Sequence, residues 1–501
     1  MDGFNHANAA SRALQTGKQE LAADPRSSGK TGEKPQPCPQ PGGVEAAIAC
    51  LKQRFTEQIA TGEELRRQHA NTLTLVENQP ADAVFFAETT ADVAQAVQTA
   101  SDFKVPIIPY GAGTSLEGHL NAPSGGICID LSRMDQVIAI NAQDLDCTVQ
   151  AGISRDKLNA TLRDTGLFFP VDPGAGEASI GGMAATRASG TCAVRYGTMR
   201  EAVLNATAVL ADGTVIKTGG RARKSAAGYD LTRLLVGSEG TLGIMTELTV
   251  RLFGRPETIL SAVAPFDTIE GACLATSEAM QLGLGLARIE LLDPLQLKAV
   301  NAHSKLSLEE VPTLFVEVHG TPDAAREQIT YFSQIAKDHG ARTFDWAEDE
   351  QERNRLWKAR HDAFWAVKSA WPGRQAIVTD VCVPISRLAE AVVATQADIE
   401  ALGLIAPIVG HVGDGNFHCI VMIDPQDTKA AETLSRFSRA LAERAIAMEG
   451  TCTGEHGIGQ GKVNLLEHEL GAGLDMMRTI KRALDPHNIL NPGKIFDLAG
   501  D

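Results

Sequence analysis

The sequence predicts an α+β protein of two domains, with a C-terminal segment that returns to the first domain. At 501 residues the chain is too long for one ordinary domain, and its apolar fraction of 44% is enough for sizeable cores. The pattern changes after Pro256, where short strands with turn signals give way to amphipathic helices that alternate with strands. We therefore place the first domain at 44–256 and the second at 257–483.

The two ends of the chain differ in composition. Residues 1–43 are polar and end in a run rich in Pro, Gly and Gln, which is typical of a flexible tail. Residues 484–501 are too apolar and too rich in turn signals for a frayed end. We expect this last segment to pack on the first domain.

The first domain begins with a helix and a β-α-β unit. Apolar residues at helical spacing run from Val44 to Phe55. A strand at 82–87, a helix at 91–101 with Thr90 as its N-cap, and a strand at 105–109 are expected next. Short strands then continue from Ile127 to Phe253, with one helix at 155–165.

The second domain is predicted from its amphipathic helices and the strands between them. Helices are expected at 268–281, 322–339, 389–401 and 430–448, and strands at 313–318, 377–383 and 419–423.

Charge and cysteine content narrow the class of protein. The formal net charge of −16 argues against nucleic acid, whose binding depends on Lys and Arg, and against an anionic membrane surface. Nine scattered cysteines without a C-x-x-C pair fit a reducing compartment and argue against a disulfide framework. No apolar run is long enough to span a membrane. We expect a cytoplasmic protein, with peripheral attachment to the inner face of the membrane as the alternative.

Three glycine-rich segments of the first domain have the composition of phosphate-binding loops. The first, 109–115, follows a predicted strand, and the others lie at 172–190 and 236–244. Bare glycine amides and nearby hydroxyls can hold a pyrophosphate. A Rossmann nicotinamide site is disfavoured, because Leu116 stands where G-x-G-x-x-G requires its last glycine. Each segment alone could be a simple turn, but the three together suggest an extended ligand such as a dinucleotide.

Two short segments of the second domain carry residues of the kinds that bind metal. Segments 410–418 and 453–459 contain three imidazoles, two carboxylates and six glycines. Imidazole and carboxylate are ligands of divalent ions such as Zn²⁺ or Mn²⁺, and glycine lets distant ligands converge. The alternative is a pair of turns whose histidines only form hydrogen bonds.

These motifs together resemble one superfamily of flavoproteins. The glycine-rich segments are similar, in order and spacing, to the flavin-binding domain of the vanillyl-alcohol oxidase / p-cresol methylhydroxylase (PCMH) superfamily. The second domain resembles the branch of cytochrome-type D-lactate dehydrogenases and D-2-hydroxyglutarate dehydrogenases. The segments that carry this second resemblance are 356–361, 379–387, 410–418, 454–459 and 491–494.

The resemblance implies a two-subdomain, PCMH-type FAD-binding domain at 44–256 and a substrate-binding cap domain at 257–483. Thr114 occupies the position where some relatives carry a histidine bonded to the flavin, so we expect non-covalent FAD. The residues implied as FAD-binding are Pro109, Gly111, Ala112, Gly113, Thr114, Ser115, Leu116, Pro173, Gly174, Ser179, Gly181, Gly182, Ser189, Gly190, Gly240, Ile244 and Asn491.

The resemblance also implies the metal site and the base. His411, His418 and Glu455 would be the metal ligands, and His456 the general base that removes the substrate's hydroxyl proton. Two imidazoles and one carboxylate leave open positions on the ion, as a catalytic site requires.

Substrate binding is assigned to cationic and aromatic residues. Arg360 would bind the substrate carboxylate with its planar fork, although a place on a solvent-facing helix is the alternative. Relatives place a lysine fifteen residues further on, where this chain has Gln375 preceded by Arg374. Arg374 is therefore assigned to the distal end of the pocket. Phe364, with Trp365 and Trp371, is expected to line that end, and a place in the core is the alternative.

The implied activity is the oxidation of a D-2-hydroxy acid, with D-lactate as first choice, to the 2-oxo acid. The hydride would pass to FAD N5, and the electrons then to cytochrome c, a quinone or an electron-transfer flavoprotein. The alternatives are a D-2-hydroxyglutarate or glycolate dehydrogenase, an oxidase that uses O₂, and a non-catalytic flavin subunit of a glycolate oxidase-like complex. A homodimer is left open.

Overall fold

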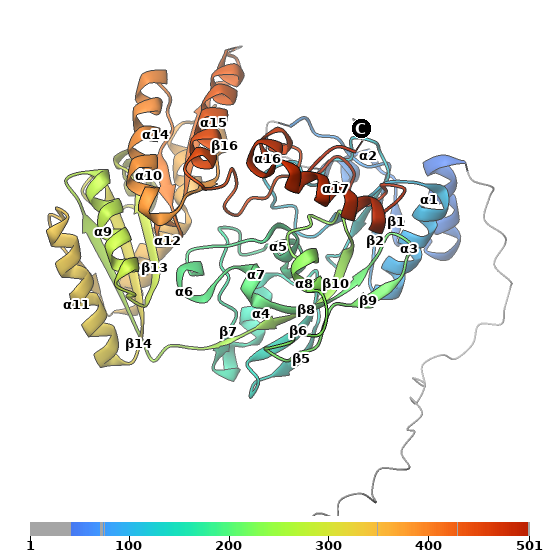
Figure 1. The fold of residues 1–501 in the computed structure, drawn as a ribbon, viewed down its shortest axis with the longest axis horizontal. Helices are drawn as coiled ribbons and strands as arrows, with labels where there is room; N and C mark the ends of the chain where they lie inside the picture. The colour runs from blue at the N-terminus through green and yellow to red at the C-terminus, as the bar shows by residue number, and fades with distance from the viewer. Residues whose placement is uncertain (1–41, 71–73, 75, 348, 428, 499–501) are drawn as a thin grey trace, which may run out of the picture. The chain divides into compact units, whose positions relative to one another are not determined.

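The computed structural model describes residues 42–70, 74, 76–347, 349–427 and 429–498 (Figure 1). The tail expected at 1–43 lies almost wholly outside the described residues. Helix α1 (Gly43–Arg54) starts within one residue of the predicted position. Its buried residues, Ala47 and Leu51, are one helical turn apart and pack into the core of the first domain.

The first sheet contains the predicted β-α-β unit. Strands β2 (Ala83–Phe86) and β3 (Ile107–Tyr110) each pair in parallel with β4 (Ile127–Asp130), and β1 (Ile59–Ala60) adds to β2 in antiparallel fashion. Helix α2 is Glu63–Gln68. The crossover helix is α3 (Thr90–Phe103). Its N-cap is Thr89 rather than Thr90, because Thr89 and Asp92 form a reciprocal capping box.

A second, antiparallel sheet has the strand order β5-β6-β10-β8-β9. Its strands are β5 (Val137–Asn141), β6 (Asp146–Gln150), β8 (Val203–Val209), β9 (Val215–Lys217) and β10 (Ile244–Arg251). The helix predicted at 155–165 is divided into α4 (Arg155–Thr161) and a 3₁₀ turn, η1 (Arg163–Thr165). The remaining elements here are β7 (Leu167–Phe168), α5 (Ile180–Thr186), α6 (Ala193–Tyr196), α7 (Met199–Ala202), α8 (Leu231–Leu235) and β11 (Phe253–Gly254), which pairs with β7.

The cap domain is built on one large sheet, which runs β15-β12-β14-β13-β18-β19-β16, with β17 also paired to β19. Its strands are β12 (Thr258–Pro265), β13 (Leu286–Leu292), β14 (Thr313–Gly320), β15 (Asp345–Ala347), β16 (Gln375–Val378), β17 (Val381–Cys382), β18 (Ile408–Gly410) and β19 (Asn416–Ile423).

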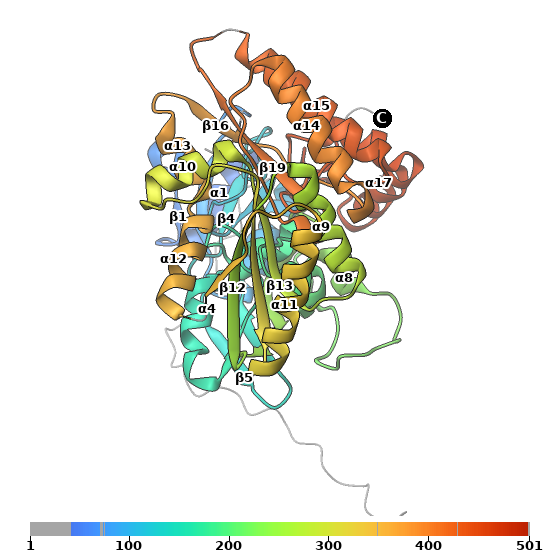
Figure 2. The same ribbon diagram turned by 90° about the vertical axis from the view of Figure 1, so that its left-hand side faces the viewer.

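Helices cover both faces of this sheet (Figure 2). One face carries α9 (Ile269–Gln281), α11 (Pro322–Asp338), α14 (Leu388–Leu402) and α15 (Ala430–Ala447). These four match the helices predicted from periodicity, and each is within two residues of its expected ends. The other face carries α10 (Pro294–Ser304), α12 (Glu350–His361) and α13 (Ala363–Ala370). Of these, only α12 was expected, as the charged helix of Arg360, and its bounds were not predicted.

The strand predicted at 377–383 is interrupted. Thr379 and Asp380 separate β16 from β17, and both residues are buried. Beside this break, β18 and β19 form a hairpin joined by the short turn η3 (Val412–Asp414). The hairpin places His411 directly after β18 and His418 within β19.

The C-terminal segment contacts the first domain. After α16 (Val463–Leu470) and α17 (Ala472–Leu484), the backbone N–H of Ile107 donates to Ile489 O at 2.7 Å. The N–H of Asn491 donates in turn to Ile107 O at 2.7 Å. Ile489 and Leu490 are buried in the core of the first domain, so the last residues extend along β3.

The described residues bear on two expectations, the absence of a disulfide framework and the absence of a membrane-spanning segment. Seven cysteines are free thiols: Cys128, Cys147, Cys192, Cys273, Cys382, Cys419 and Cys452. Cys50 is disulfide-bonded, so the expectation against disulfides holds only for those seven. Within the described ranges, no helix combines the length and the hydropathy that a membrane crossing needs.

Candidate functional site

A cavity of about 640 Å³ brings the glycine-rich segments of the first domain together with the metal-type residues of the cap. All the residues predicted to bind FAD line it, except Ser189 and Gly190. Gly190 packs instead behind the wall, where an added Cβ would lie 2.3 Å from the carbonyl oxygen of Asp172. The three segments therefore converge as an extended cofactor would require.

Close packing explains the glycines at this wall. A Cβ at Gly111 would lie 2.1 Å from Oγ of Ser179, which caps α5 by accepting from the N–H of Gly182. A Cβ at Gly240 would lie 2.4 Å from Pro109, and the φ of Gly240 is +72°. The first glycine-rich segment thus packs closely against the second and the third at positions where only glycine fits.

The wall also holds residues that the sequence analysis missed. Glu239 accepts hydrogen bonds from the N–H groups of Ile458 and Gly459, at 2.7 and 2.8 Å, and lies 3.2 Å from Nε2 of His119. Burial alone would raise the pKa of Glu239, but His119 and the two amides outweigh it and hold the pKa below its usual value. This buried carboxylate therefore ties the third glycine-rich segment to the segment that carries Glu455.

The three predicted metal ligands meet at one point. Nε2 of His411 and Nε2 of His418 lie 3.4 and 3.3 Å from the same carboxylate oxygen, Oε1 of Glu455. One ligand atom from each residue can be chosen within 4.8 Å of the other two. The other oxygen of Glu455 is buried and has no partner among the described residues. A divalent ion fits this set, because it would satisfy the carboxylate oxygen Oε2, which has no partner among the described residues.

The far nitrogens of both imidazoles are held in place. Nδ1 of His411 donates to Glu290 at 2.8 Å, and Nδ1 of His418 donates to the carbonyl of Thr379 at 3.0 Å. Both rings therefore turn Nε2 inwards, as ligands with fixed tautomers do. Burial would lower the pKa of His411, but the carboxylates of Glu290 and Glu455 raise it well above its usual value. A metal ion would have to displace that proton.

His456 lies against His418, one of the predicted metal ligands. Their rings are stacked, with centroids 5.1 Å apart and an interplanar angle of 14°. Burial lowers the pKa of His456 to about 4, so the ring is neutral at pH 7. Its Nδ1 is buried without a hydrogen-bond partner among the described residues. Its Nδ1 is therefore open to a hydrogen bond with a group that enters the cavity.

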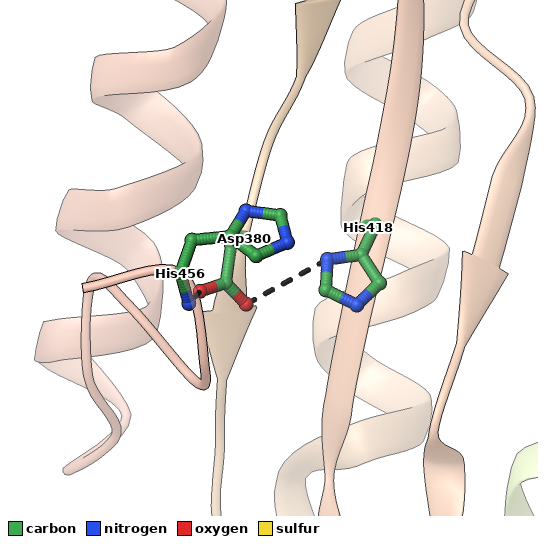
Figure 3. Close-up of side chains that lie close together, drawn as sticks. All are labelled: Asp380, His418 and His456. Atoms are coloured by element: carbon green, nitrogen blue, oxygen red, sulfur yellow. Dashed lines mark hydrogen bonds and ion pairs between the residues drawn. The ribbon is translucent and has the colours of Figure 1, made fainter. Parts of the chain in front are cut away.

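Asp380 lies beside His418 and His456 (Figure 3), and its Oδ1 is 3.6 Å from Nδ1 of His418. Asp380 also anchors the segment that carries Glu455 and His456. It accepts the backbone N–H groups of both residues at 2.9 Å and the hydroxyl of Thr453 at 2.8 Å. Asp380 could also form a metal-type set with His418 and His456. Its oxygens already accept these hydrogen bonds, so it is better suited to fix the segment than to bind an ion.

Arg360 lines the same cavity and is 7% exposed, so the solvent-facing alternative is wrong. Its guanidinium forms an ion pair with the fully buried Glu290. Its Nε has no partner among the described residues. Arg360 and His411 are therefore joined through one carboxylate that sequence reasoning did not single out, since Glu290 lies in a strand without a motif.

Of the two other residues predicted for the substrate pocket, the structure places Phe364 in the cavity lining and Arg374 outside it. Phe364 is half-buried and lines the cavity beside the exposed Trp365. Arg374 is exposed, does not line the cavity, and donates to the carbonyl of Met422 at 3.3 Å. The structure places Arg374 on the outside of the pocket wall.

Comparison with protein-family models accounts for most of the chain. Residues 81–219 match the FAD binding domain family, and residues 255–495 match the family of the C-terminal domain of FAD linked oxidases. The glycine-rich cavity therefore belongs to an FAD-binding domain, and FAD is its cofactor.

Two similar proteins illustrate the relationship. A probable mitochondrial D-lactate dehydrogenase of Danio rerio is 49% identical over 88% of this chain and 90% of its own length. A mitochondrial D-lactate dehydrogenase [cytochrome] of Arabidopsis thaliana is 45% identical over 90% of this chain and 80% of its own. Both names include a mitochondrial location, which the sequence analysis did not predict.

A solved structure supports the fold. p-Cresol methylhydroxylase with bound substrate superimposes with a TM-score of 0.75 over 92% of this chain and 99% of its own, at 17% identity. The likeness confirms the predicted fold class, an FAD-binding domain of PCMH type with an α+β cap.

Proposed function

The chain belongs to the family of FAD-linked oxidases that contains the D-lactate dehydrogenases, and from that premise we propose that it oxidises a D-2-hydroxy acid to the 2-oxo acid. D-lactate is the first candidate, because it is the substrate named for both relatives. The single observation that carries the proposal is the cavity in which the FAD loops face His411, His418, Glu455 and His456.

The substrate carboxylate would bind Arg360. Glu290 accepts from one terminal nitrogen of this guanidinium. The Nε of Arg360 is buried and has no hydrogen-bond partner among the described residues. A carboxylate bound there would satisfy an N–H that otherwise carries a desolvation cost of about 1–3 kcal/mol. Phe364 and Ile420 line the same cavity and suit a small apolar side chain on the substrate.

The hydroxyl end of the substrate would lie at the three metal-type ligands. A divalent ion such as Zn²⁺ or Mn²⁺, held by His411, His418 and Glu455, would supply a Lewis acid that polarises the hydroxyl and favours its deprotonation. Glu290 and the carbonyl of Thr379 keep both imidazole Nε2 atoms turned to this point. The chain's own contribution is thus a fixed, largely buried set of ligands.

His456 would take the hydroxyl proton. Its Nδ1 has no partner among the residues the structure describes, and its backbone is held by Asp380. Because it stacks on His418, its position relative to the substrate hydroxyl is set by the same element that holds the metal-type ligands. FAD, when bound, supplies the hydride acceptor, N5, for the hydrogen on C2.

The electron acceptor in the proposed reaction is a cytochrome. The name of the Arabidopsis relative includes this acceptor, and we extend it to this chain. A cytochrome is a stronger candidate than a nicotinamide cofactor, since segment 109–116 lacks the Rossmann fingerprint.

Anaerobic bleaching of the flavin tests the proposal. The FAD-loaded protein would be mixed with D- and L-lactate, D-2-hydroxyglutarate and glycolate, with and without a chelator. We expect fast bleaching by D-lactate, little by L-lactate, and loss of bleaching without loss of flavin when the metal is removed. Bleaching by D-lactate in demonstrably metal-free protein would remove the metal from the mechanism. No bleaching by any acid would favour a non-catalytic flavin subunit.

A pair of variants tests the carboxylate site. Arg360→Gln should raise the KM for the acid by at least tenfold. Arg355→Gln removes the same charge from an exposed position on the same helix and should leave KM within twofold. Equal KM values in both variants would remove Arg360 from substrate binding.

A further inference from the structure

A second cavity of about 400 Å³ lies between the FAD-binding domain and the cap and shares no lining residue with the first. Four arginines line it: Arg155, Arg255, Arg288 and Arg353. Arg155 begins α4 and Arg353 lies on α12, two helices that approach each other at the domain boundary (Figure 2). The cavity is therefore cationic in a chain whose net charge is −16.

Only one of these arginines has its charge neutralised inside the protein. Arg288 lies 3.1 Å from Asp172 and 3.2 Å from Glu317, and its guanidinium stacks over Trp357. Glu317 is the only carboxylate in the lining, and it also pairs with His319 at 2.7 Å. The lining acid is therefore already engaged by Arg288 and His319.

None of the other three arginines forms an ion pair with a buried carboxylate of the described residues, although the buried Asp172 attracts Arg155 at longer range. Arg155 pairs only with the exposed Asp156, at 2.9 Å. Arg255 and Arg353 form no ion pair with any residue the structure describes. Nε of Arg155 and Nε of Arg353 are buried and have no hydrogen-bond partner among those residues.

This arrangement is costly for an empty cavity. Like charges that share a cleft repel one another, and the low dielectric of the walls strengthens their field. Each buried N–H without a partner adds a desolvation cost. A bound anion would remove both costs, and a guanidinium fork matches the oxygens of a carboxylate or a phosphate group.

We propose that this cavity binds a small, multiply charged oxyanion, the class that includes phosphate groups and dicarboxylates. Arg155 and Arg353 hold it through their unpaired Nε atoms, and Arg255 closes the exposed side. The volume is large enough for such a ligand but smaller than the flavin cavity. The Arg288–Asp172 pair separates the two, because Asp172 lines the first cavity and Arg288 the second.

The test uses FAD-loaded protein, so that the pyrophosphate site of the first cavity is filled. Thermal unfolding and titration calorimetry would be measured with sodium phosphate and, separately, with sodium malonate, at constant ionic strength set by sodium chloride. We expect a saturable rise in Tm with at least one of the two anions, because a ligand that binds only the folded state stabilises it.

Variants locate the binding. Arg155→Gln with Arg353→Gln should weaken anion affinity at least tenfold while bleaching by the substrate acid is retained. Arg355→Gln is the matched control, since Arg355 is exposed on the same helix and does not line the cavity. Arg255→Gln alone, at an exposed residue without an ion pair among those described, should weaken affinity severalfold and provides a milder change if the double variant folds poorly.

The outcomes divide clearly. If only phosphate binds saturably, the cavity is assigned to a phosphorylated ligand. If only malonate binds saturably, it is assigned to a dicarboxylate. If both bind, the site recognises the oxyanion charge that the two share. The proposal is overturned if neither anion gives a saturable response. It is equally overturned if Arg355→Gln loses as much affinity as the variants of the lining arginines.

Discussion

Glu290 accepts a hydrogen bond from Nδ1 of His411 at 2.8 Å. Burial would raise the pKa of Glu290, but Arg360 and His411 outweigh it and hold the pKa below its usual value, so the carboxylate is charged and can only accept. The bond leaves Nε2 of His411 facing Glu455. Since the same carboxylate pairs with Arg360, one buried acid orients both a proposed metal ligand and the proposed substrate-binding cation.

Replacing Glu290 with Gln should weaken metal binding about 10- to 100-fold. An amide can donate as well as accept, so it no longer fixes the tautomer of His411. Competition titration with a chelator would measure the affinity, and flavin content would report the fold. Glu278→Gln is a matched control, because it removes a carboxylate 2.6 Å from another histidine, His339, far from the cavity lining. Unchanged metal affinity in Glu290→Gln would show that His411 does not bind the ion through Nε2.

Replacing His456 with Ala should stop flavin reduction by the substrate but keep FAD and metal. The side chain lines the cavity, whereas its backbone N–H is what Asp380 holds, so the segment keeps its anchor. Loss of a general base typically costs about 10²- to 10⁴-fold in rate. Stopped-flow absorbance under anaerobic conditions measures this, with the exposed His468→Ala as control. If His456→Ala reduces the flavin at the wild-type rate, His456 is not the general base.

Replacing Gly111 with Ala should destabilise the flavin-free protein by about 1–3 kcal/mol. The new Cβ would lie 2.1 Å from Oγ of Ser179 and would displace the N-cap of α5. Gly174→Ala is the matched control, since Gly174 lines the same cavity but has nothing within 4 Å of its ideal Cβ position. Urea unfolding curves of the two variants give the comparison. A similar free energy of unfolding for both would argue against the tight contact between the first two glycine-rich segments.

Stability should rise with pH above neutrality because of Lys494. Burial lowers the pKa of this lysine from 10.5 to about 7, while its ammonium donates to the carbonyl of Asn121 at 2.7 Å. The unfolded chain therefore binds the proton more tightly, so the free energy of unfolding gains up to about 1.4 kcal/mol per pH unit between about 7 and 10.5. Below about pH 7 the lysine is protonated in both the folded and the unfolded state, so the free energy of unfolding no longer gains from this group as the pH changes.

Denaturant unfolding between pH 7 and pH 10 checks this prediction. Lys494→Met should flatten the slope, whereas Lys337→Met, at an exposed position on α11, should leave it unchanged. Equal slopes in Lys494→Met and the wild type would mean that the C-terminal segment does not bury this amine.

Local patterns in the sequence predicted much of the fold. The four helices on one face of the cap sheet were predicted because each has an apolar stripe that the sheet buries. Arg360 was expected on a charged helix, but the bounds of α12 were not predicted. Charged residues dominate its sequence, and its inward face is formed by only a few side chains such as Trp357 and Arg360. The strand at 377–383 was predicted as continuous, since a buried Asp380 between apolar residues carries no local signal for a break.

Some residues of the candidate site could likewise be predicted from local sequence, and others could not. Composition marked the glycine-rich segments and the two segments that hold imidazoles and carboxylates. The resemblance to flavoproteins then singled out His411, His418 and Glu455 as the predicted ligands. Glu290, Asp380 and Glu239 could not be recognised, because each is an ordinary acid in its own segment and acquires its role from a partner at least 36 positions away in the chain. Arg374 was assigned to the pocket from its position in the sequence, but β16 leaves it exposed.

The sequence by itself determined the chemistry available to this protein: glycine-rich loops for a dinucleotide, imidazoles and carboxylates for a divalent ion, and apolar periodicities for two domains. Only the tertiary structure decided which groups face one another. The pairing of β13 with β18, the anchoring of segment 453–459 by Asp380 and Glu239, and the cationic cavity between the domains all arise from contacts between distant segments. Side-chain type is a local property, whereas burial, tautomer and charge pairing depend on neighbours that folding supplies.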